Sequence, residues 1–288
     1  METKPVVSSK RALRVGTQPY LSAKPLVWAL KKIAPQVEIT EHNPRALSSL
    51  LVSGKLDVAL VPLVTVLRHP DLAIVPGISV STIGKARNAM IFSKVASADI
   101  KNILVDRSSV NSVALIRALF RIRWSMQPLE VLSSNPLTPD YPFMERDYDA
   151  YMMIGDNAMN VKTEFEKTID LGEQWEQWTH VPLVHAVWAI REDIQGPPID
   201  KFLLEAKKHG IYDLGEIIQH ATAHLGMEKE QCRQLLKNTS YDLKKHHVKG
   251  IERFHYYMEA VKICKPQLTL KFYHGDHVKV HNLIKEEN

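Results

Sequence analysis

The feature that most constrains the fold is a regular alternation of short apolar runs with helical patterns. Between those runs, Leu26, Leu30 and Ile33 share one helical face, and Asn43 with Pro44 begins a second helix as N-cap and first-turn proline. This alternation predicts an α/β chain. The strand-like runs of the first half lie at residues 13–16, 37–40, 58–61, 72–75, 90–92 and 103–105.

The pattern changes in the second half of the chain. Strand-like runs at residues 150–155, 168–171 and 186–190 continue the alternation, but from Pro198 to Val261 apolar residues recur at helical spacing. The last third is therefore expected to be mostly helical. Beyond Pro266, residues 268–280 alternate around Gly275-Asp276, which predicts a terminal hairpin, with an unstructured tail as the alternative.

The length of the chain favours two lobes. A single core stops growing near ~250–300 residues, and this chain has 288. We place the crossings between lobes near residues 96–101 and 181–185. The first lobe would then comprise residues 13–96 plus 186–263, the second residues 97–185, and residues 264–288 a C-terminal extension. A lobe interrupted by another leaves a cleft of the kind that closes on small ligands.

Charge and composition exclude several classes of protein. The 37 Lys and Arg against 32 Asp and Glu give a net charge of +5, too small to indicate a nucleic-acid partner but compatible with a small anionic ligand. Cys232 and Cys264 lie far apart without metal-ligand spacing, so we expect reduced thiols. Neither a signal-peptide core nor a membrane-spanning apolar run is present, which predicts a cytoplasmic protein with no membrane partner. The oligomeric state stays open.

Standard catalytic signatures are missing, but one turn has the chemistry of an anion site. The sequence contains no GxSxG, GxxxxGK[ST], HExxH or Gly-rich dinucleotide loop, and its 13 histidines are scattered, so we predict no metal. The turn runs from Asp106 to Ser112, between a strand and a helix, where free N–H groups and the helix dipole favour a carboxylate or phosphate. Ordinary N-capping by Ser109 or Asn111 explains the same residues equally well.

Two further segments carry polar groups after strands. Residues 18–25 place Ser22 and Lys24 at the carboxyl edge of the predicted sheet, where Lys24 can meet an anion or simply face solvent. Residues 85–88 add cations near a crossing strand, where most charges are only surface charges. Trp175 and Trp178 share a helical face, which favours a packed aromatic cluster at the second crossing.

These segments together resemble one family, the chorismate dehydratases of the futalosine menaquinone pathway, on the type II periplasmic-binding-protein-like fold. The resemblance covers roughly residues 13–263, and its most specific part is the DLGE…W…WT…P…AVWA signature that begins at Asp170. Other matching pieces are YLSAKPL from Tyr20, GKLDVALVP from Gly54, SSVNSV from Ser108, IGDNA from Ile154, SYDL from Ser240 and GIERF from Gly250.

The resemblance implies a two-lobed α/β fold, an interlobe cleft and a hydro-lyase that needs neither metal nor organic cofactor. The implied reaction removes water from chorismate to give 3-[(1-carboxyvinyl)oxy]benzoate, with a carboxylate of the substrate as proton acceptor. It implies catalytic roles for Ser22 and Asn88. The residues expected to bind the substrate are Ser109, Asn111, Ser112, Lys24, Arg87 and Asp156.

Five positions depart from the family pattern. Ser22 stands where the family usually has Asn and Asn88 where it usually has Ser, so two polar groups are exchanged. Leu63, Thr65 and Val66 replace residues that are usually polar. Because small displacements of reacting groups are costly, these changes leave open a second reading, a noncatalytic protein that binds or senses a small carboxylate on the same fold.

Overall fold

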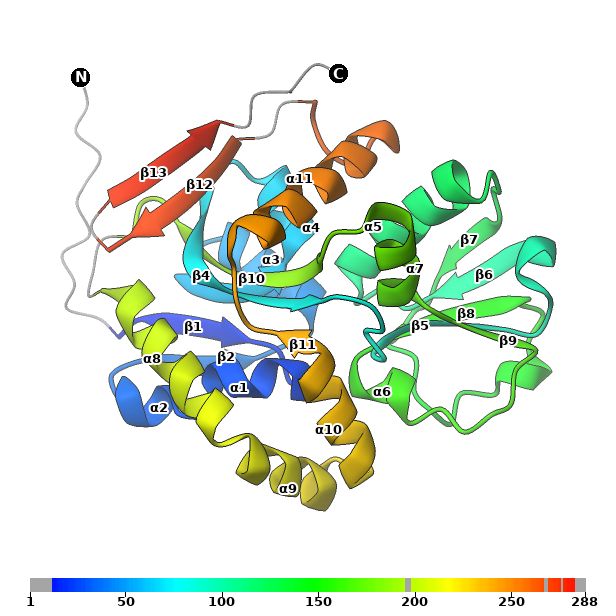
Figure 1. Cartoon of the computed structure of the whole chain (residues 1–288), viewed down its shortest axis with the longest axis horizontal. Coiled ribbons are helices and arrows are strands. Elements are labelled where there is room, and N and C mark those ends of the chain that lie inside the picture. The colour runs from blue at the N-terminus through cyan, green and yellow to red at the C-terminus, as the bar shows by residue number, and fades with distance from the viewer. Residues whose placement is uncertain (1–11, 195–197, 267–268, 276, 283–288) are drawn as a thin grey trace.

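The computed structural model describes residues 12–194, 198–266, 269–275 and 277–282, and it confirms a two-lobed α/β architecture (Figure 1). The strands of these residues form two sheets, and each sheet is the centre of one lobe. Helices of the C-terminal third pack on the first sheet, as the apolar spacing predicts.

The first sheet mixes parallel and antiparallel strands in the order β13-β12-β4-β10-β3-β1-β2, with β11 pairing with β4. Its strands are β1 (Arg14–Thr17), β2 (Glu38–Glu41), β3 (Val58–Pro62), β4 (Leu72–Thr82), β10 (Leu183–Arg191), β11 (Thr239–Ser240), β12 (Thr269–His274) and β13 (His277–Asn282). Strands β2 and β3 run parallel to β1, whereas β10 runs antiparallel to β3 and β4. The antiparallel pairing of β12 with β13 confirms the terminal hairpin, although Asp276 of its turn lies outside the described residues.

The second sheet has the order β7-β6-β8-β5-β9. Its strands are β5 (Ala89–Ser93), β6 (Asn102–Val105), β7 (Leu129–Leu132), β8 (Ala150–Ile154) and β9 (Lys167–Asp170). Strand β5 pairs with β8 and β9, so residues 89–93 belong to this sheet and not to the first lobe, where the division at residue 96 had put them. We therefore propose that the chain crosses between Thr82 and Ala89 and returns between Thr179 and Leu183.

The helices of the first lobe cover both faces of its sheet. Helices α1, α2, α8, α9 and α10 share one apolar cluster with the sheet, whereas α3, α4 and α11 share the other. In the second lobe, α5 and α7 pack on one face of the sheet and α6 lies beside the other. Their bounds are α1 (Lys24–Val27), α2 (Leu30–Ile33), α3 (Pro44–Val52), α4 (Leu63–Arg68), α5 (Val110–Ala118), α6 (Gly155–Met159), α7 (Leu171–Thr179), α8 (Ile199–Tyr212), α9 (Leu214–His224), α10 (Lys229–Asn238) and α11 (Lys245–Ala260).

The two helical signals of the first lobe have different outcomes. The Asn43 side chain accepts the Ala46 N–H at 2.9 Å, which confirms the predicted N-cap of α3. The pattern from Leu26 to Ile33 instead forms two short helices, α1 and α2, with the break at Trp28 and Ala29. A three-residue 3-10 turn, η1 (Leu21–Ala23), precedes α1.

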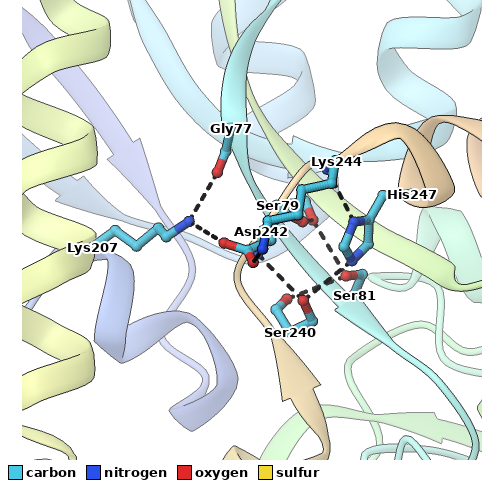
Figure 2. Close-up of polar contacts among 8 residues, drawn as sticks. All are labelled: Gly77, Ser79, Ser81, Lys207, Ser240, Asp242, Lys244 and His247. Atoms are coloured by element: carbon cyan, nitrogen blue, oxygen red, sulfur yellow. Dashed lines mark hydrogen bonds and ion pairs between the residues drawn. The ribbon is translucent and has the colours of Figure 1, made fainter.

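A polar cluster fastens the C-terminal helices to the first sheet. Figure 2 shows the Asp242 carboxylate between Lys207 of α8 and Lys244, whose Nζ atoms lie 2.6 and 2.5 Å from its oxygens. His247 Nδ1 accepts the Lys244 N–H at 3.1 Å, so in the neutral ring the proton is on Nε2, which lies 3.2 Å from Ser240 Oγ. The hydroxyls of Ser79 and Ser81 in β4 donate to the Asp242 and Ser240 carbonyls. The cluster therefore holds β11 and the start of α11 against β4.

The predicted tryptophan cluster is confirmed as a contact between the lobes. Trp175 of α7 is completely buried, and its ring lies 5.8 Å from that of Phe254 in α11. Trp178 stacks on Tyr257 with ring centroids 3.9 Å apart. The two tryptophans belong to α7 of the second lobe, whereas their partners belong to α11, which packs on the first sheet. These ring contacts therefore join the two lobes beside the return crossing.

Candidate functional site

A pocket lies between the two lobes, at the ends of several strands. The segment after β1, the end of β4 and strands β10 and β11 contribute from the first lobe, and the starts of β5, α5 and α6 from the second. The lining residues are Gln18, Tyr20, Ser22, Pro44, Pro62, Val80, Thr82, Asn88, Ala89, Ser109, Val110, Asn111, Ser112, Ile154, Gly155, His185, Ala186 and Thr239.

The two exchanged polar residues meet in this pocket. Ser22 lies in η1 of the first lobe and Asn88 directly before β5, and Asn88 Nδ2 donates to Ser22 Oγ at 3.3 Å. Ser22 is buried, and the Asn88 carbonyl accepts the Gly155 N–H at 2.8 Å. The structure therefore places both side chains in direct contact, so exchanging Asn and Ser leaves a donor and an acceptor at the same junction.

The serine-rich turn also reaches the pocket. Ser109 is the N-cap residue of α5, but its side chain makes no capping hydrogen bond, and Ser109 and Ser112 both line the pocket wall. The first N–H groups of a helix lack intrahelical partners. This end of α5 therefore offers hydroxyls, N–H groups and the positive end of the helix dipole to an anion.

Asn111 has a different role from Ser109 and Ser112. Its Oδ1 accepts the Val64 N–H at 3.1 Å, and its Nδ2 donates to the Val184 carbonyl at 3.4 Å. The amide therefore ties α5 of the second lobe to α4 and β10 of the first. It lines the pocket while both ends of its side chain are bound to protein.

Of the remaining predicted residues, Lys24 and Asp156 have protein partners for their side chains, whereas the buried Nε of Arg87 has no hydrogen-bond partner. Lys24 Nζ lies 2.8 Å from Glu41 Oε1 in an ion pair at the surface of the first lobe. The backbone N–H of Arg87 donates to Asp170 at 2.7 Å, in a left-handed conformation with φ of 66°. Asp156 accepts the Leu21 N–H on both carboxylate oxygens, at 3.0 and 3.1 Å.

The sequence pattern did not single out several residues of the wall. Thr82 and His185 stand at facing ends of β4 and β10, and Thr82 Oγ1 lies 2.9 Å from His185 Nε2. Burial lowers the pKa of His185 to about 4, so its ring is neutral at pH 7. The sequence signal for these two residues is a polar residue near the end of a long strand. It is hidden for Thr82, because the apolar run at 72–75 indicates only the first part of β4, which extends to Thr82.

Tyr20 is a second residue that the pattern left without a role. Burial raises the pKa of its hydroxyl, and the charges of Asp106 and Asp156 add to this effect, so Tyr20 stays protonated. Its hydroxyl is hydrogen-bonded to Ser108, whose own hydroxyl donates to Asp106 at 2.6 Å. A neutral phenol therefore links the first lobe to the turn before α5.

The other three altered positions belong to the core. Leu63, Thr65 and Val66 are buried in α4, where Leu63 and Val66 pack in the main apolar cluster. Thr65 Oγ1 lies 2.8 Å from Ser48 Oγ of α3. These substitutions therefore fill the interface between two helices and the first sheet.

The described part of the chain contains no group of three His, Cys, Asp or Glu side chains arranged to hold a metal ion. Among the same residues, no helix combines the length and apolarity that a membrane crossing requires.

Three known proteins are similar to this chain over most of its length. A chorismate dehydratase of Thermus thermophilus is 28% identical over 237 residues, covering 73% of this chain and 83% of that protein. A structural-genomics protein of Archaeoglobus fulgidus, with 16% identity, superposes with a TM-score of 0.68 over 89% of this chain and all of that chain. The periplasmic aliphatic sulphonate binding protein of Escherichia coli, also 16% identical, gives 0.57 over 89% and 94% of the two chains.

The two structural likenesses show the periplasmic-binding-protein-like fold alone. The family assignment comes from sequence: the model of a family described as menaquinone biosynthesis matches residues 13–260, most of the chain. The chain therefore belongs to the menaquinone biosynthesis family.

Proposed function

We propose that this protein is a hydro-lyase of the chorismate dehydratase type. The substrate is chorismate, and the product is 3-[(1-carboxyvinyl)oxy]benzoate. The observation that carries the proposal is the meeting of Ser22 and Asn88 across the two lobes, beside the open start of α5. The 28% identical relative from Thermus thermophilus carries the same activity in its name.

The reaction needs little from the protein beyond positioning. The C–H bond breaks at the ring carbon that bears the ether, and its electron pair becomes part of the aromatic ring. The C–O bond of the neighbouring hydroxyl then breaks, and the released hydroxide takes up the abstracted proton and leaves as water. Aromatisation supplies the driving force. A carboxylate of the substrate is the proton acceptor in this proposal, and Ser22 with Asn88 orients the ring and its leaving hydroxyl.

The pocket supports capture of carboxylates by hydrogen bonds. Among the lining residues that the structure describes there is no lysine or arginine. Ser109 and Ser112 with the N–H groups of α5 would hold one carboxylate of chorismate, in place of the cations Lys24 and Arg87 that the sequence suggested. Neutral Tyr20 and His185 add hydrogen-bonding groups without adding charge.

The expected location is the cytoplasm, where chorismate, a small anionic substrate, would reach the enzyme in free solution. We expect neither a metal nor an organic cofactor in the reaction, because aromatisation drives the loss of water and a carboxylate of the substrate accepts the proton. The proposal therefore requires only the protein and chorismate for turnover.

The deciding experiment incubates the purified protein with chorismate and follows the mixture by mass spectrometry for a product lighter by one water. Ser22→Ala and Asn88→Ala should each lower kcat by about 10- to 100-fold, because each removes half of the contact that orients the ring. Glu164→Gln, at an exposed position of the second lobe, is the matched control and should be fully active.

Each alternative outcome has a distinct meaning. A chorismate-dependent rise in Tm without product would indicate a binding protein with an intact pocket and would overturn the lyase proposal. Neither product nor a rise in Tm would show that chorismate is the wrong ligand. Full turnover by both alanine variants would remove Ser22 and Asn88 from their proposed roles.

A further inference from the structure

Three consecutive residues of the first lobe each contact the second lobe. Tyr20 packs against Gly155, Leu21 donates its N–H to Asp156, and Ser22 accepts from Asn88. Residues 20–22 therefore form a clasp between the lobes. The last contact of this clasp, between Ser22 and Asn88, joins the two residues that have catalytic roles in the proposed function.

The Leu21–Asp156 contact supplies a cap that η1 lacks locally. Tyr20 is the N-cap residue of η1, and its side chain makes no capping hydrogen bond. The Leu21 N–H instead points at the Asp156 carboxylate, 3.0 and 3.1 Å from its oxygens. Leu21 is fully buried, so without Asp156 its N–H would lose a charged acceptor in a place of limited access to water.

The Tyr20–Gly155 contact brings the two segments close enough for this hydrogen bond. Gly155 has a φ of 68°, and a Cβ placed on it would lie 2.5 Å from Tyr20 Cε1. Only a glycine therefore permits the tyrosine ring to lie over the start of α6. Asp156 follows Gly155 directly, so the same close approach presents its carboxylate to Leu21.

We propose that Asp156 is a positioning residue for the reaction: by holding the Leu21 N–H from the opposite lobe, it places Ser22 Oγ against Asn88. This inference rests on the proposed function, because Ser22 and Asn88 have their catalytic roles only there. It changes the role of Asp156 from the substrate contact that the sequence suggested to a contact within the protein. Since Leu21 and Ser22 share a peptide bond, movement of one amide moves the next side chain.

The test compares three variants. Asp156→Asn keeps a carbonyl oxygen that can accept the Leu21 N–H, whereas Asp156→Leu is similar in size and has no acceptor. Asp147→Leu removes an exposed carboxylate from the same lobe and is the matched control. Circular dichroism and the Tm of each variant establish that it is folded before any comparison is made.

The first readout is hydrogen exchange at the Leu21 amide, measured without ligand. Exchange should be at least about tenfold faster in Asp156→Leu than in the wild type, and nearly unchanged in Asp156→Asn and Asp147→Leu. This readout does not depend on turnover. Equal protection of Leu21 in all four proteins would overturn the inference even if chorismate dehydration were established.

The second readout is steady-state turnover of chorismate. Asp156→Leu should lower kcat by about 10- to 100-fold with a smaller change in KM, whereas Asp156→Asn should stay within about threefold of the wild type. Equal losses of kcat in both variants would indicate that the charge of Asp156 acts directly, and would overturn the positioning role. A wild type without turnover would refute the proposed function instead, and the exchange readout would still decide whether Asp156 holds Leu21.

Discussion

At Asp156, burial and hydrogen bonding shift the pKa in opposite directions. Burial raises the pKa of this carboxyl from 3.8 to about 6, although the Leu21 N–H and the charge of Lys24 both lower it. The folded protein therefore binds a proton at Asp156 between pH 4 and 6 that the unfolded chain has lost. Because the unfolded state binds fewer protons there, Asp156 makes stability fall as the pH rises through this window.

Asp156→Asn should remove this pH dependence. Relative to the wild type, the variant should gain stability as the pH rises from 4 to 6 and keep a constant advantage above pH 6, at most about 3 kcal/mol. Urea unfolding of both proteins at several pH values from 4 to 8 measures the difference. A difference in the free energy of unfolding that stays constant from pH 4 to 8 would contradict the raised pKa of Asp156.

His247 should act with the opposite sign. Burial lowers its pKa to about 4, the nearby cations His246, Lys244 and Lys207 add to the decrease, and Asp242 opposes it. The unfolded chain then binds more protons between pH 4 and 6.5, so stability is lost as the pH falls through this window. Relative to His247→Gln, the wild type should become less stable as the pH falls from 6.5 to 4, in the same urea titration. A difference that is independent of pH would contradict a neutral His247.

At the scale of single elements, two helical glycines should respond oppositely to alanine. Gly215 in α9 has open space where an alanine Cβ would lie, whereas a Cβ on Gly250 in α11 would lie 2.2 Å from the Pro182 carbonyl oxygen. Gly215→Ala should therefore stabilise the protein by up to about 1 kcal/mol through helix propensity. Gly250→Ala should destabilise it, because α11 must move away from the return crossing at Pro182.

Urea midpoints of the two variants, measured side by side, check this pair. The two variants change the same atoms in two helices of the same lobe, so a difference in sign isolates the close approach at Pro182. Stabilisation by Gly250→Ala would show that α11 is free to shift at this point.

The elements that sequence predicts well here are those with a strong local signal. Strands β3 and β6 are apolar and buried, and the N-cap at Asn43 is read from one dipeptide. Strand β7 was missed because it is a short edge strand: Leu129 is 67% exposed, and none of its four residues is buried. The lobe assignment of β5 depends on which strands it pairs with, and nothing within residues 89–93 encodes that.

The same distinction holds for the site. Ser22, Asn88, Ser109 and Ser112 were named from sequence motifs, and the structure brings them to one pocket. His185 carries no motif of its own and joins the wall only because β10 runs antiparallel to β4. The role of Lys24 stays a prediction: the structure shows its ion pair with Glu41, which comes from a strand that sequence patterns do not place beside it.

For the whole molecule, Asp170 is the point where the outward crossing is joined to the start of α7, the helix that leads to the return crossing. Its carboxylate accepts the N–H groups of Ala86 and Arg87 in the outward crossing, at 2.9 and 2.7 Å. It also caps α7, accepting from Gly172 and Glu173 at 2.9 and 3.1 Å. Four N–H groups from two segments thus converge on one side chain, which accounts for the Asp at the head of the DLGE signature.

Asp170→Ala should therefore cost much more than the loss of an ordinary helix cap. Asn43→Ala removes a cap that binds a single N–H within one lobe and should cost about 1 kcal/mol. Asp170→Ala leaves four donors without their acceptor and releases Arg87, a non-glycine residue with φ of 66°, so we expect a loss of at least about 3 kcal/mol. Urea unfolding followed by both tryptophan fluorescence and circular dichroism measures the cost and shows whether the lobes still unfold together. A cost no larger than that of Asn43→Ala would mean that the outward crossing is held independently of α7, and that the lobes are joined mainly by the aromatic contacts of Trp175 and Trp178 with α11.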